Sequence, residues 1–123
     1  MRELQNAGIG VVAICANDAA RYPEDSPAML LKQAREWSFS FPYLHDATQE
    51  VARAYDAVCT PDFFGYDADL RLRYRGRLDS AQRNPRTPQT RRELVAAMLR
   101  VARGEALSEL QEPSIGCSIK WAT

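Results

Sequence analysis

The stretch "AVCTPDFFGYDADLRLRYRG", residues 57–76, decides the fold of this chain. Apolar residues and arginines alternate over residues 70–78, and this period of two predicts a β-strand with one wet face. The aromatic segment "DFFGYD" before it predicts a partner strand, and the acidic turn at 67–69 closes a hairpin. Cys59 stands two residues before Pro61, which raises the question whether its thiol is buried or reactive.

The arginines of the alternating run allow two interpretations. They could bind an anionic ligand, or they could form the solvated face of an edge strand, where like charges oppose aggregation. We interpret them as the solvated face. The four residues are Arg71, Arg73, Arg75 and Arg77.

Three elements are expected before the hairpin region. Residues 2–6 with Gly8 have the pattern of a last helical turn closed by a glycine. The β-branched run "IGVVAICAN", residues 9–17, predicts a core strand of a parallel sheet, covered on both faces. The segment "SPAMLLKQAREW" predicts a helix with Ser26 as N-cap and Pro27 at the first position. Its apolar face is expected to hold Leu30, Leu31, Ala34 and Trp37.

Two more helices are expected on either side of the hairpin. In "DATQEVARAYDAV", Asp46 is the expected N-cap, with Gln49 three residues later. In "TRRELVAAMLRVARG", Thr90 and Glu93 form the pattern of a capping box, and Gly104 marks the end. The apolar stripe of this last helix is expected to be Leu94, Val95, Met98, Val101 and Ala102.

Length and composition indicate one folded domain. The 123 residues suffice for a single core, expected over residues 1–104, with 105–123 as a C-terminal tail. The 16 basic and 16 acidic residues leave no net charge to hold nucleic acid or an anionic membrane. The N-terminus lacks the apolar region of a signal peptide, and no apolar run approaches the roughly 20 residues of a membrane helix. We therefore expect a cytoplasmic protein that binds neither nucleic acid nor a membrane.

The cysteines differ in their local context. Three widely spaced cysteines favour neither a disulfide framework nor a zinc site, and no metal is expected. Cys15 lies in the apolar run and is interpreted as an inert core residue, whereas Cys59 stays open between packing and reactivity. Cys117 follows Gly116 in an irregular tail, which favours an accessible thiol. His45, the one histidine, precedes an expected N-cap and is interpreted as a surface or capping-region residue rather than a catalytic one.

Several segments together resemble one family. The segment "FPYLHDATQEVARAYDAVCTPDFFGYDADLRLRYRGRLD" resembles the second half of a thioredoxin-like domain of the alkyl hydroperoxide reductase/thiol-specific antioxidant group, AhpC/TSA. The segments "YPEDSP" and "PSIGCSIKW" resemble a bacterial branch described as thioredoxin family proteins. The resemblance implies an α/β, thioredoxin-like fold that is incomplete here. It would have a mixed sheet with a C-terminal β-hairpin, and helices on both faces.

The resemblance also implies roles for single residues. Pro61 would be the cis-proline of the thioredoxin fold, and Thr60 before it would offer backbone groups to an extended substrate. Cys59 would flank this loop without being the nucleophile. Members of this branch carry the nucleophilic cysteine in an Asn-His-Cys-Pro segment, which these 123 residues do not contain. The attacking thiolate is then missing from the chain.

The resemblance thus implies a thiol–disulfide oxidoreductase or a peroxiredoxin-like antioxidant protein, inactive or impaired as this chain. Cys117, or less favourably Cys59, would resolve a sulfenate or a mixed disulfide. The substrate would be a peroxide or a protein thiol, and a thioredoxin-type protein would be the reductant. The resemblance implies no cofactor. Whether the protein forms a homodimer stays open. The alternative is a non-catalytic thioredoxin-like module that binds or scaffolds a partner by β-addition.

The missing segment has a structural consequence as well. In the thioredoxin fold, the strand before the nucleophile lies between the strands equivalent to residues 9–16 and 62–66. Without it, two apolar strand edges face a gap, which favours aggregation unless the gap is filled. Three arrangements stay open: direct pairing of the two strands, a partner chain between them, or a longer native protein.

Overall fold

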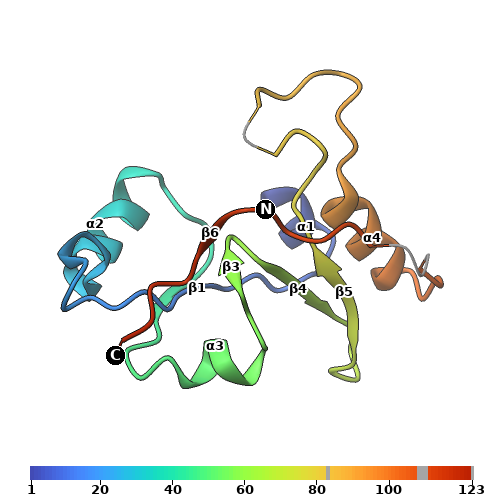
Figure 1. Cartoon of the computed structure of the whole chain (residues 1–123). Coiled ribbons are helices and arrows are strands. Elements are labelled where there is room, and N and C mark those ends of the chain that lie inside the picture. Colours follow the sequence, from blue (N-terminus) through green and yellow to red (C-terminus); the bar gives the residue numbers. More distant parts are fainter. Residues whose placement is uncertain (83, 108–110, 123) are drawn as a thin grey trace. The chain divides into compact units, whose positions relative to one another are not determined.

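The structure is a computed structural model that describes residues 1–82, 84–107 and 111–122, and the chain divides into two units. The first unit comprises Met1–Arg2, Gly10–Val58 and Ser118–Thr123, and the second comprises Glu3–Ile9 and Cys59–Cys117. Helices and short strands occur in both units, so the architecture is mixed α/β, as predicted (Figure 1). Within the described ranges, no helix has the length and apolar character needed to cross a membrane.

The first unit holds one parallel pair of strands. β1 (Ala13–Cys15) pairs with β2 (Tyr43–His45), with Ile14 opposite Leu44. Its helical segments are the 3₁₀ turn η1 (Pro23–Asp25), α2 (Pro27–Glu36) and α3 (Glu50–Ala54). Its small apolar core consists of Ala16, Ala52 and Ile119, with Ala57 and Trp121 packed against it.

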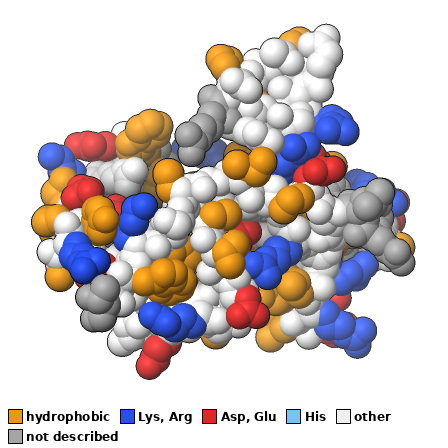
Figure 2. Space-filling model, viewed as in Figure 1, with side chains coloured by type: hydrophobic (Ala, Val, Ile, Leu, Met, Phe, Trp, Pro, Cys, Tyr) orange, Lys and Arg blue, Asp and Glu red, His pale blue; other side chains and the backbone are white. Residues whose placement is uncertain are grey.

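The parallel pairing of β1 was predicted, but the prediction that both of its faces are covered is wrong for the described residues. Ile14 is 42% exposed, Leu44 is 50% exposed and Val12 is 56% exposed. Among the described residues this sheet has two strands, and a parallel sheet normally needs cover on both sides. The pair therefore presents exposed apolar side chains. Figure 2 shows apolar side chains exposed among charged ones of both signs on one face of the molecule.

Helix α2 begins as predicted. The Ser26 Oγ accepts a hydrogen bond from the backbone N–H of Met29 at 3.4 Å, and Pro27 is the first helical residue. Leu30 is buried, but Leu31 and Trp37 are exposed, so the predicted apolar face is too wide. Leu31 lies about 100° around the helix from Leu30, and Trp37 is the residue that caps the C-terminal end.

Helix α3 begins later than predicted. Its first residue is Glu50, and Gln49 stands at the N-cap with a left-handed φ of 65°. The expected N-cap, Asp46, instead reaches over the intervening turn, where its Oδ2 accepts a hydrogen bond from the N–H of Ala52 at 2.9 Å. Asp46 thus still satisfies a donor of the first helical turn, although the chain enters the helix three residues after the position expected.

The second unit is built on the predicted hairpin. β4 (Phe63–Tyr66) and β5 (Leu72–Gly76) are antiparallel, with Phe63 opposite Gly76. The other elements with residues in this unit are α1 (Arg2–Asn6), β3 (Cys59–Thr60), α4 (Glu93–Ala102) and β6 (Cys117–Ser118). β3 pairs with β6.

The second hairpin strand starts at Leu72, later than the alternation at residue 70 suggested. Leu70 has a left-handed φ of 61° and is exposed in the turn. The Asp67 Oδ1 holds this turn by accepting hydrogen bonds from the N–H groups of Asp69 at 2.9 Å and Arg71 at 3.0 Å. A short acidic side chain commonly fixes such a turn by bonding to the backbone that follows it.

Helix α4 packs against the hairpin, as Figure 1 shows. Leu94, Val95 and Met98 are buried, which confirms the main part of the predicted stripe, whereas Ala102 is exposed. Gly65 of β4 makes the close approach possible, since a Cβ there would collide with the Met98 Sδ. Gly8 after α1 and Gly104 after α4 both have positive φ, as expected of glycines that end helices.

The predicted capping box at the start of α4 is wrong. Thr90 Oγ1 accepts a hydrogen bond from the N–H of Thr87 at 2.8 Å, inside the preceding loop. Glu93 binds Arg77 instead, with 2.6 Å between Glu93 Oε2 and Arg77 Nη2. A half-buried ion pair with Arg77, the residue after β5, therefore takes the carboxylate that the local pattern assigned to the start of the helix.

The interpretation of the four arginines as a bare solvated face needs correction. Arg71 is exposed, but the other three bind carboxylates within the second unit. These pairs are Arg73 with Asp67 at 3.4 Å, Arg75 with Asp62 at 3.5 Å, and Arg77 with Glu93 at 2.6 Å. The run therefore ties β5 to its turn, to the residue after Pro61 and to α4.

The strands that the structure describes pair two by two: β1 with β2, β3 with β6, and β4 with β5. In the part of the chain that the structure describes, β1 thus has β2 as its sheet neighbour and β4 has β5. Direct pairing of the strands at 9–16 and 62–66, one of the three arrangements considered above, is not what is found.

Tyr74, buried on β5, gives the second unit a pH-dependent stability. Burial of the phenol, with the negative charge of Glu93 adding to it, raises the pKa of Tyr74 to about 12. An unfolded tyrosine ionises near about 10, so stability falls as pH rises from about 10 to about 12. Tyr74→Phe is expected to flatten this part of the profile, measured as urea midpoints across that range. Tyr55→Phe, at an exposed tyrosine, is the control, and equal slopes for the two variants would contradict the assignment.

Candidate functional site

The candidate site is centred on the Thr60–Pro61 loop of the second unit. The peptide bond between these residues is cis. Thr60 Oγ1 donates a hydrogen bond to the backbone carbonyl of Cys117 at 3.3 Å, so the strand pair β3–β6 brings the cysteine of the tail to this loop. Two of the residues proposed from the sequence, Thr60 and Cys117, are thereby placed together.

Gly116 explains how the tail comes so close. A Cβ at this position would collide with the backbone oxygen of Thr60 and would approach the nitrogen of Pro61. Backbone atoms at a paired strand cannot move aside as a flexible side chain can. The glycine before Cys117 is thus required by the contact with the loop, and not by an unusual φ.

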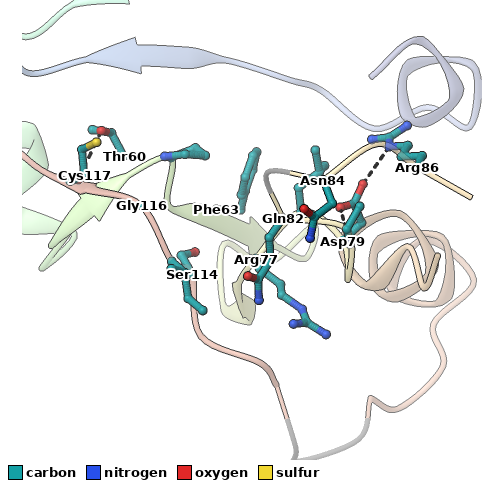
Figure 3. Close-up of a pocket in the computed structure, with 14 residues that line it drawn as sticks. Thr60, Phe63, Arg77, Asp79, Gln82, Asn84, Arg86, Ser114, Gly116 and Cys117 are labelled. Atoms are coloured by element: carbon teal, nitrogen blue, oxygen red, sulfur yellow. Dashed lines mark hydrogen bonds and ion pairs between the residues drawn. The ribbon is translucent and has the colours of Figure 1, made fainter.

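A cavity of about 460 Å³ opens beside this loop, within the second unit. Thr60, Pro61 and Phe63 line it from the hairpin side, and Gly116 and Cys117 line it from the tail. In Figure 3, Cys117 and Thr60 lie at one end of the lining residues, Asp79 and Arg86 lie at the other, and Phe63 lies between them. The site therefore combines an accessible sulfur with a space large enough for an organic ligand.

Cys117 is exposed, and it is the most accessible of the three cysteines. The structure describes all three, and none is in a disulfide. Cys15 of β1 is half-buried in the first unit, and burial raises the pKa of its thiol. Since the thiolate is the reactive form, a raised pKa makes Cys15 a poor nucleophile near neutral pH.

Cys59 is half-buried at the start of the loop, and its Sγ donates a hydrogen bond to the carbonyl of Pro61 at 3.6 Å. Burial raises the pKa of this thiol, the negative charge of Asp62 raises it further, and the guanidinium of Arg75 opposes both. The hydrogen bond holds the protonated form, which also disfavours the thiolate. The geometry thus places Cys59 next to the loop in a form that reacts slowly.

Asp62 links these groups. Its Oδ1 accepts a hydrogen bond from the Ser114 Oγ at 2.9 Å, and its Oδ2 lies 3.5 Å from Arg75 Nη2. Ser114 also bonds to the carbonyl of Gly76 at 2.6 Å. The residue after the cis-proline therefore ties the hairpin to the tail that carries Cys117, a role that the sequence pattern did not indicate.

Removing the charge of Asp62 should make Cys59 more reactive. In Asp62→Asn the nearby negative charge is lost while Arg75 stays, so the pKa of Cys59 falls and its thiolate fraction at pH 8 rises. We expect alkylation of Cys59 by iodoacetamide to become several-fold faster, measured by peptide mass spectrometry. Asp69→Asn, the same change at an exposed turn residue, should leave the rate unchanged. A slower or unaltered rate in Asp62→Asn would contradict the role given to this carboxylate.

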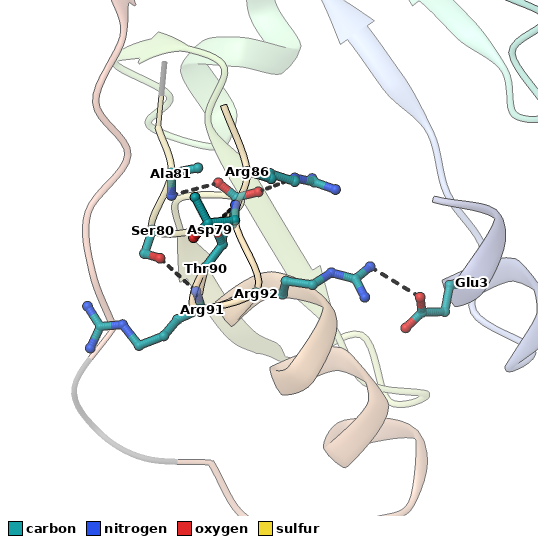
Figure 4. A network of polar contacts seen from close by, with 9 residues as sticks. Glu3, Asp79, Ser80, Ala81, Arg86, Thr90, Arg91 and Arg92 are labelled. Carbon is teal, nitrogen blue, oxygen red and sulfur yellow. Dashed lines mark hydrogen bonds and ion pairs between the residues drawn. The ribbon is translucent and has the colours of Figure 1, made fainter. Parts of the chain in front are cut away.

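Described residues between Asp79 and Arg86 form the far wall of the cavity. The Asp79 carboxylate is buried, and its Oδ2 accepts a hydrogen bond from the Arg86 Nε at 2.8 Å (Figure 4). Its Oδ1 accepts from the N–H of Ala81 at 3.1 Å. Ser80 and Arg91 close the base of the loop, since each donates from its backbone N–H to an oxygen of the other at 2.8 and 2.7 Å. No pattern in the sequence indicated this wall.

The tail after Cys117 is fixed within the first unit by Gln49. The Gln49 Nε2 donates to the carbonyls of Ala16 at 2.7 Å and Lys120 at 2.9 Å, and its Oε1 accepts from the N–H of Ala122 at 3.0 Å. The Asn17 Oδ1 accepts from the N–H of Lys120 at 2.9 Å. The segment therefore docks in an extended form through its backbone, which was not predicted from the sequence.

No metal centre is formed by the described parts of the chain, which hold no group of three or more histidine, cysteine or carboxylate side chains placed to bind an ion. His45 lies on β2, half-buried, and its Nδ1 has no hydrogen-bond partner there. His45 is thus less exposed than a surface residue, and it directly precedes Asp46, whose carboxylate bonds to the first turn of α3.

Comparison with known proteins agrees with the family resemblance described for the sequence. Residues 1–75 match the family model described as the AhpC/TSA family. No curated protein gives a significant match. An uncharacterized conserved protein from Geobacillus kaustophilus is similar in structure, with a TM-score of 0.91 and 50% identity over 98% of this chain and 64% of that one.

A second solved structure, a hypothetical protein from Sinorhizobium meliloti 1021, has a TM-score of 0.91 and 42% identity over 98% of this chain and 66% of that one. The chain thus spans slightly less than two thirds of the length of both similar proteins. These likenesses, with the mixed α/β architecture, make the fold thioredoxin-like, as the resemblance implied.

Proposed function

The chain belongs to the AhpC/TSA family, and we propose on this basis that the protein takes part in thiol–disulfide or peroxide redox chemistry, with Cys117 as its exchanging thiol. The family is of the thioredoxin-like, peroxiredoxin type. The observation that carries the proposal is the hydrogen bond from Thr60 to the carbonyl of Cys117, which holds an exposed cysteine at the cis Thr60–Pro61 loop.

In this proposal the Cys117 thiolate attacks a sulfur of a disulfide, a new S–S bond forms, and the second sulfur leaves as a thiolate. With a sulfenic acid the same thiol forms the disulfide and releases water. Thr60 and Pro61 align the incoming sulfur, and Cys59, which is held protonated, takes the lesser role. A thioredoxin-type protein then reduces the mixed disulfide, so the partners are a protein thiol or a peroxide-derived sulfenate and this reductant.

The 123 residues contain no Asn-His-Cys-Pro segment, so in the proposed scheme they exchange disulfides without turning over peroxide by themselves. The test is NADPH oxidation through thioredoxin reductase and thioredoxin, with oxidised glutathione or hydrogen peroxide as oxidant. We expect NADPH oxidation above the background of the reductase system with oxidised glutathione, lost in Cys117→Ser and kept in Cys15→Ser. Equal rates in these two variants would overturn the role of Cys117.

A non-catalytic binding role is the second candidate. The observation that favours it is the apolar face of the β1–β2 pair, where Ile14 and Leu44 are exposed on a sheet with two open edges. The same experiment separates the candidates, because a binding module needs no exchange at any of its cysteines. A chain in which glutathione reacts with none of the three would support this second role.

A further inference from the structure

The cavity beside Thr60 and Pro61 is large for a redox site that takes a hydroperoxide. Its volume is about 460 Å³, whereas a water molecule occupies about 30 Å³ of liquid and hydrogen peroxide is only slightly larger. Volumes of about 300–1,000 Å³ are typical of sites that hold organic ligands. The cavity volume therefore favours an organic ligand that carries side chains over a hydroperoxide.

The charged side chains that the structure describes around the cavity are already paired. Arg86 binds Asp79 at 2.8 Å, and Arg77 binds Glu93 at 2.6 Å. These are the two described arginines among the lining residues. A ligand would not need a phosphate or a carboxylate to satisfy them, because an arginine held in a close carboxylate pair has little left to offer a second anion.

Three apolar side chains belong to the lining and are named the cavity floor. Phe63, Leu78 and Ile115 line the cavity together with Cys117. Ile115 is 63% exposed, two residues before Cys117 in the chain. An apolar side chain of a ligand that covered it would remove this surface from water, which is favourable in proportion to the area buried.

The far wall is built before any ligand arrives. Asp79 holds Arg86 and Ala81, and the paired hydrogen bonds of Ser80 and Arg91 close the loop at its base (Figure 4). A wall held by a buried carboxylate needs less ordering when a ligand binds, and this preserves affinity. The cavity thus has an apolar floor, a fixed polar wall and a sulfur at one end.

We infer that this cavity is a subsite for an apolar residue that lies next to the reacting cysteine of a polypeptide disulfide. The inference rests on the proposed function, because it takes Cys117 as the exchanging thiol. The Cys117 thiolate attacks the cysteine sulfur of the peptide, the original S–S bond breaks, and the other half leaves as a thiolate. The proton of Cys117 goes to solvent, and no oxidant besides the disulfide is consumed.

The experiment compares two peptide probes that carry the same disulfide. In Leu-Phe-Cys and Gly-Gly-Cys peptides, the cysteine is joined to thionitrobenzoate, whose release is followed by absorbance. The protein is the Cys15→Ser/Cys59→Ser variant, so that Cys117 is the thiol that reacts with the probe. We expect the Leu-Phe-Cys probe to react about ten-fold faster, the factor that burial of part of one apolar side chain gives.

Two matched substitutions locate the effect. Ile115→Asp places a charge on the cavity floor at an exposed position, and it should reduce the preference to about two-fold or less. Leu70→Asp makes the same change in the hairpin turn, where Leu70 is 82% exposed and does not line the cavity, and it should keep the preference.

The outcomes separate this inference from the proposed function. Equal rates of the two probes at Cys117 would overturn the subsite while leaving Cys117 as an exchanging thiol. A preference lost equally in both aspartate variants would also overturn the subsite. Failure of Cys117 to react with either probe would overturn the proposed function, and the subsite with it.

Discussion

Gln49→Leu is expected to destabilise the first unit by about 3 kcal/mol, because it leaves several buried polar groups without partners. Gln49 is 2% exposed, and its amide bonds to the carbonyls of Ala16 and Lys120 and to the N–H of Ala122. Leucine has a similar volume and can fill the space, so the lost stability would come from the missing hydrogen bonds and not from a cavity. The measurement is urea unfolding followed by circular dichroism.

The same variant should release the tail. Hydrogen exchange at the amides of Lys120 and Ala122 is expected to become faster, since both donate to side chains that hold the segment in place. Gln33→Leu, on the exposed side of α2, is the matched control and should change neither stability nor exchange. A Gln49→Leu protein as stable as Gln33→Leu would contradict the anchoring role.

Gly116→Ala is expected to have the second large effect, a loss of about 2 kcal/mol, the usual cost of forcing an extra carbon into a packed site. The added Cβ would collide with the backbone oxygen of Thr60, so β6 would have to move away from β3. The hydrogen bond from Thr60 to the carbonyl of Cys117 would then be lost.

The functional consequence of Gly116→Ala differs from a simple loss of folding. Cys117 stays exposed and should still react with a small disulfide reagent, but it should no longer prefer the apolar peptide probe. Gly10→Ala is the control, because a Cβ at that position meets no atom within 4 Å and its φ is not positive. Retention of both stability and preference in Gly116→Ala would show that the tail does not depend on its contact with the loop.

The parts of the fold that were predictable from the sequence are those set by neighbouring residues. The alternation after residue 70 and the aromatic segment before it specify the hairpin, because side chains of a strand alternate between two faces. Ser26 and Pro27 specify the start of α2, since the cap bonds to a residue three positions away. Gly8 and Gly104 mark helix ends because they tolerate positive φ.

The predictions failed where distant residues compete for the same group. Glu93 had the spacing of a capping box, but Arg77, 16 residues away, binds its carboxylate. Gln49 was read as part of a helix start, but its amide bonds to the tail 71 and 73 residues away. The prediction that the β1 segment is buried was wrong, because the burial of a strand depends on neighbouring strands, which a local sequence pattern does not specify.

The candidate site divides in the same way. The cysteines and the Thr60–Pro61 pair were visible in the sequence, and the family resemblance drew attention to them. Their arrangement was not visible, since Thr60 and Cys117 lie 57 residues apart and the wall beside them depends on Asp79 and Arg86. The site was therefore predictable as a set of residues, and its cavity was not.

The role of Cys117 as the exchanging thiol is tested most directly by finding which cysteine of the reduced chain first forms a mixed disulfide with oxidised glutathione. The sample is quenched with acid at intervals, and each cysteine is followed by peptide mass spectrometry. We predict that Cys117 is modified first, while Cys59 and Cys15, whose thiols are half-buried and have raised pKa values, lag behind. First modification at Cys59 or Cys15, or no modification at Cys117, would contradict it.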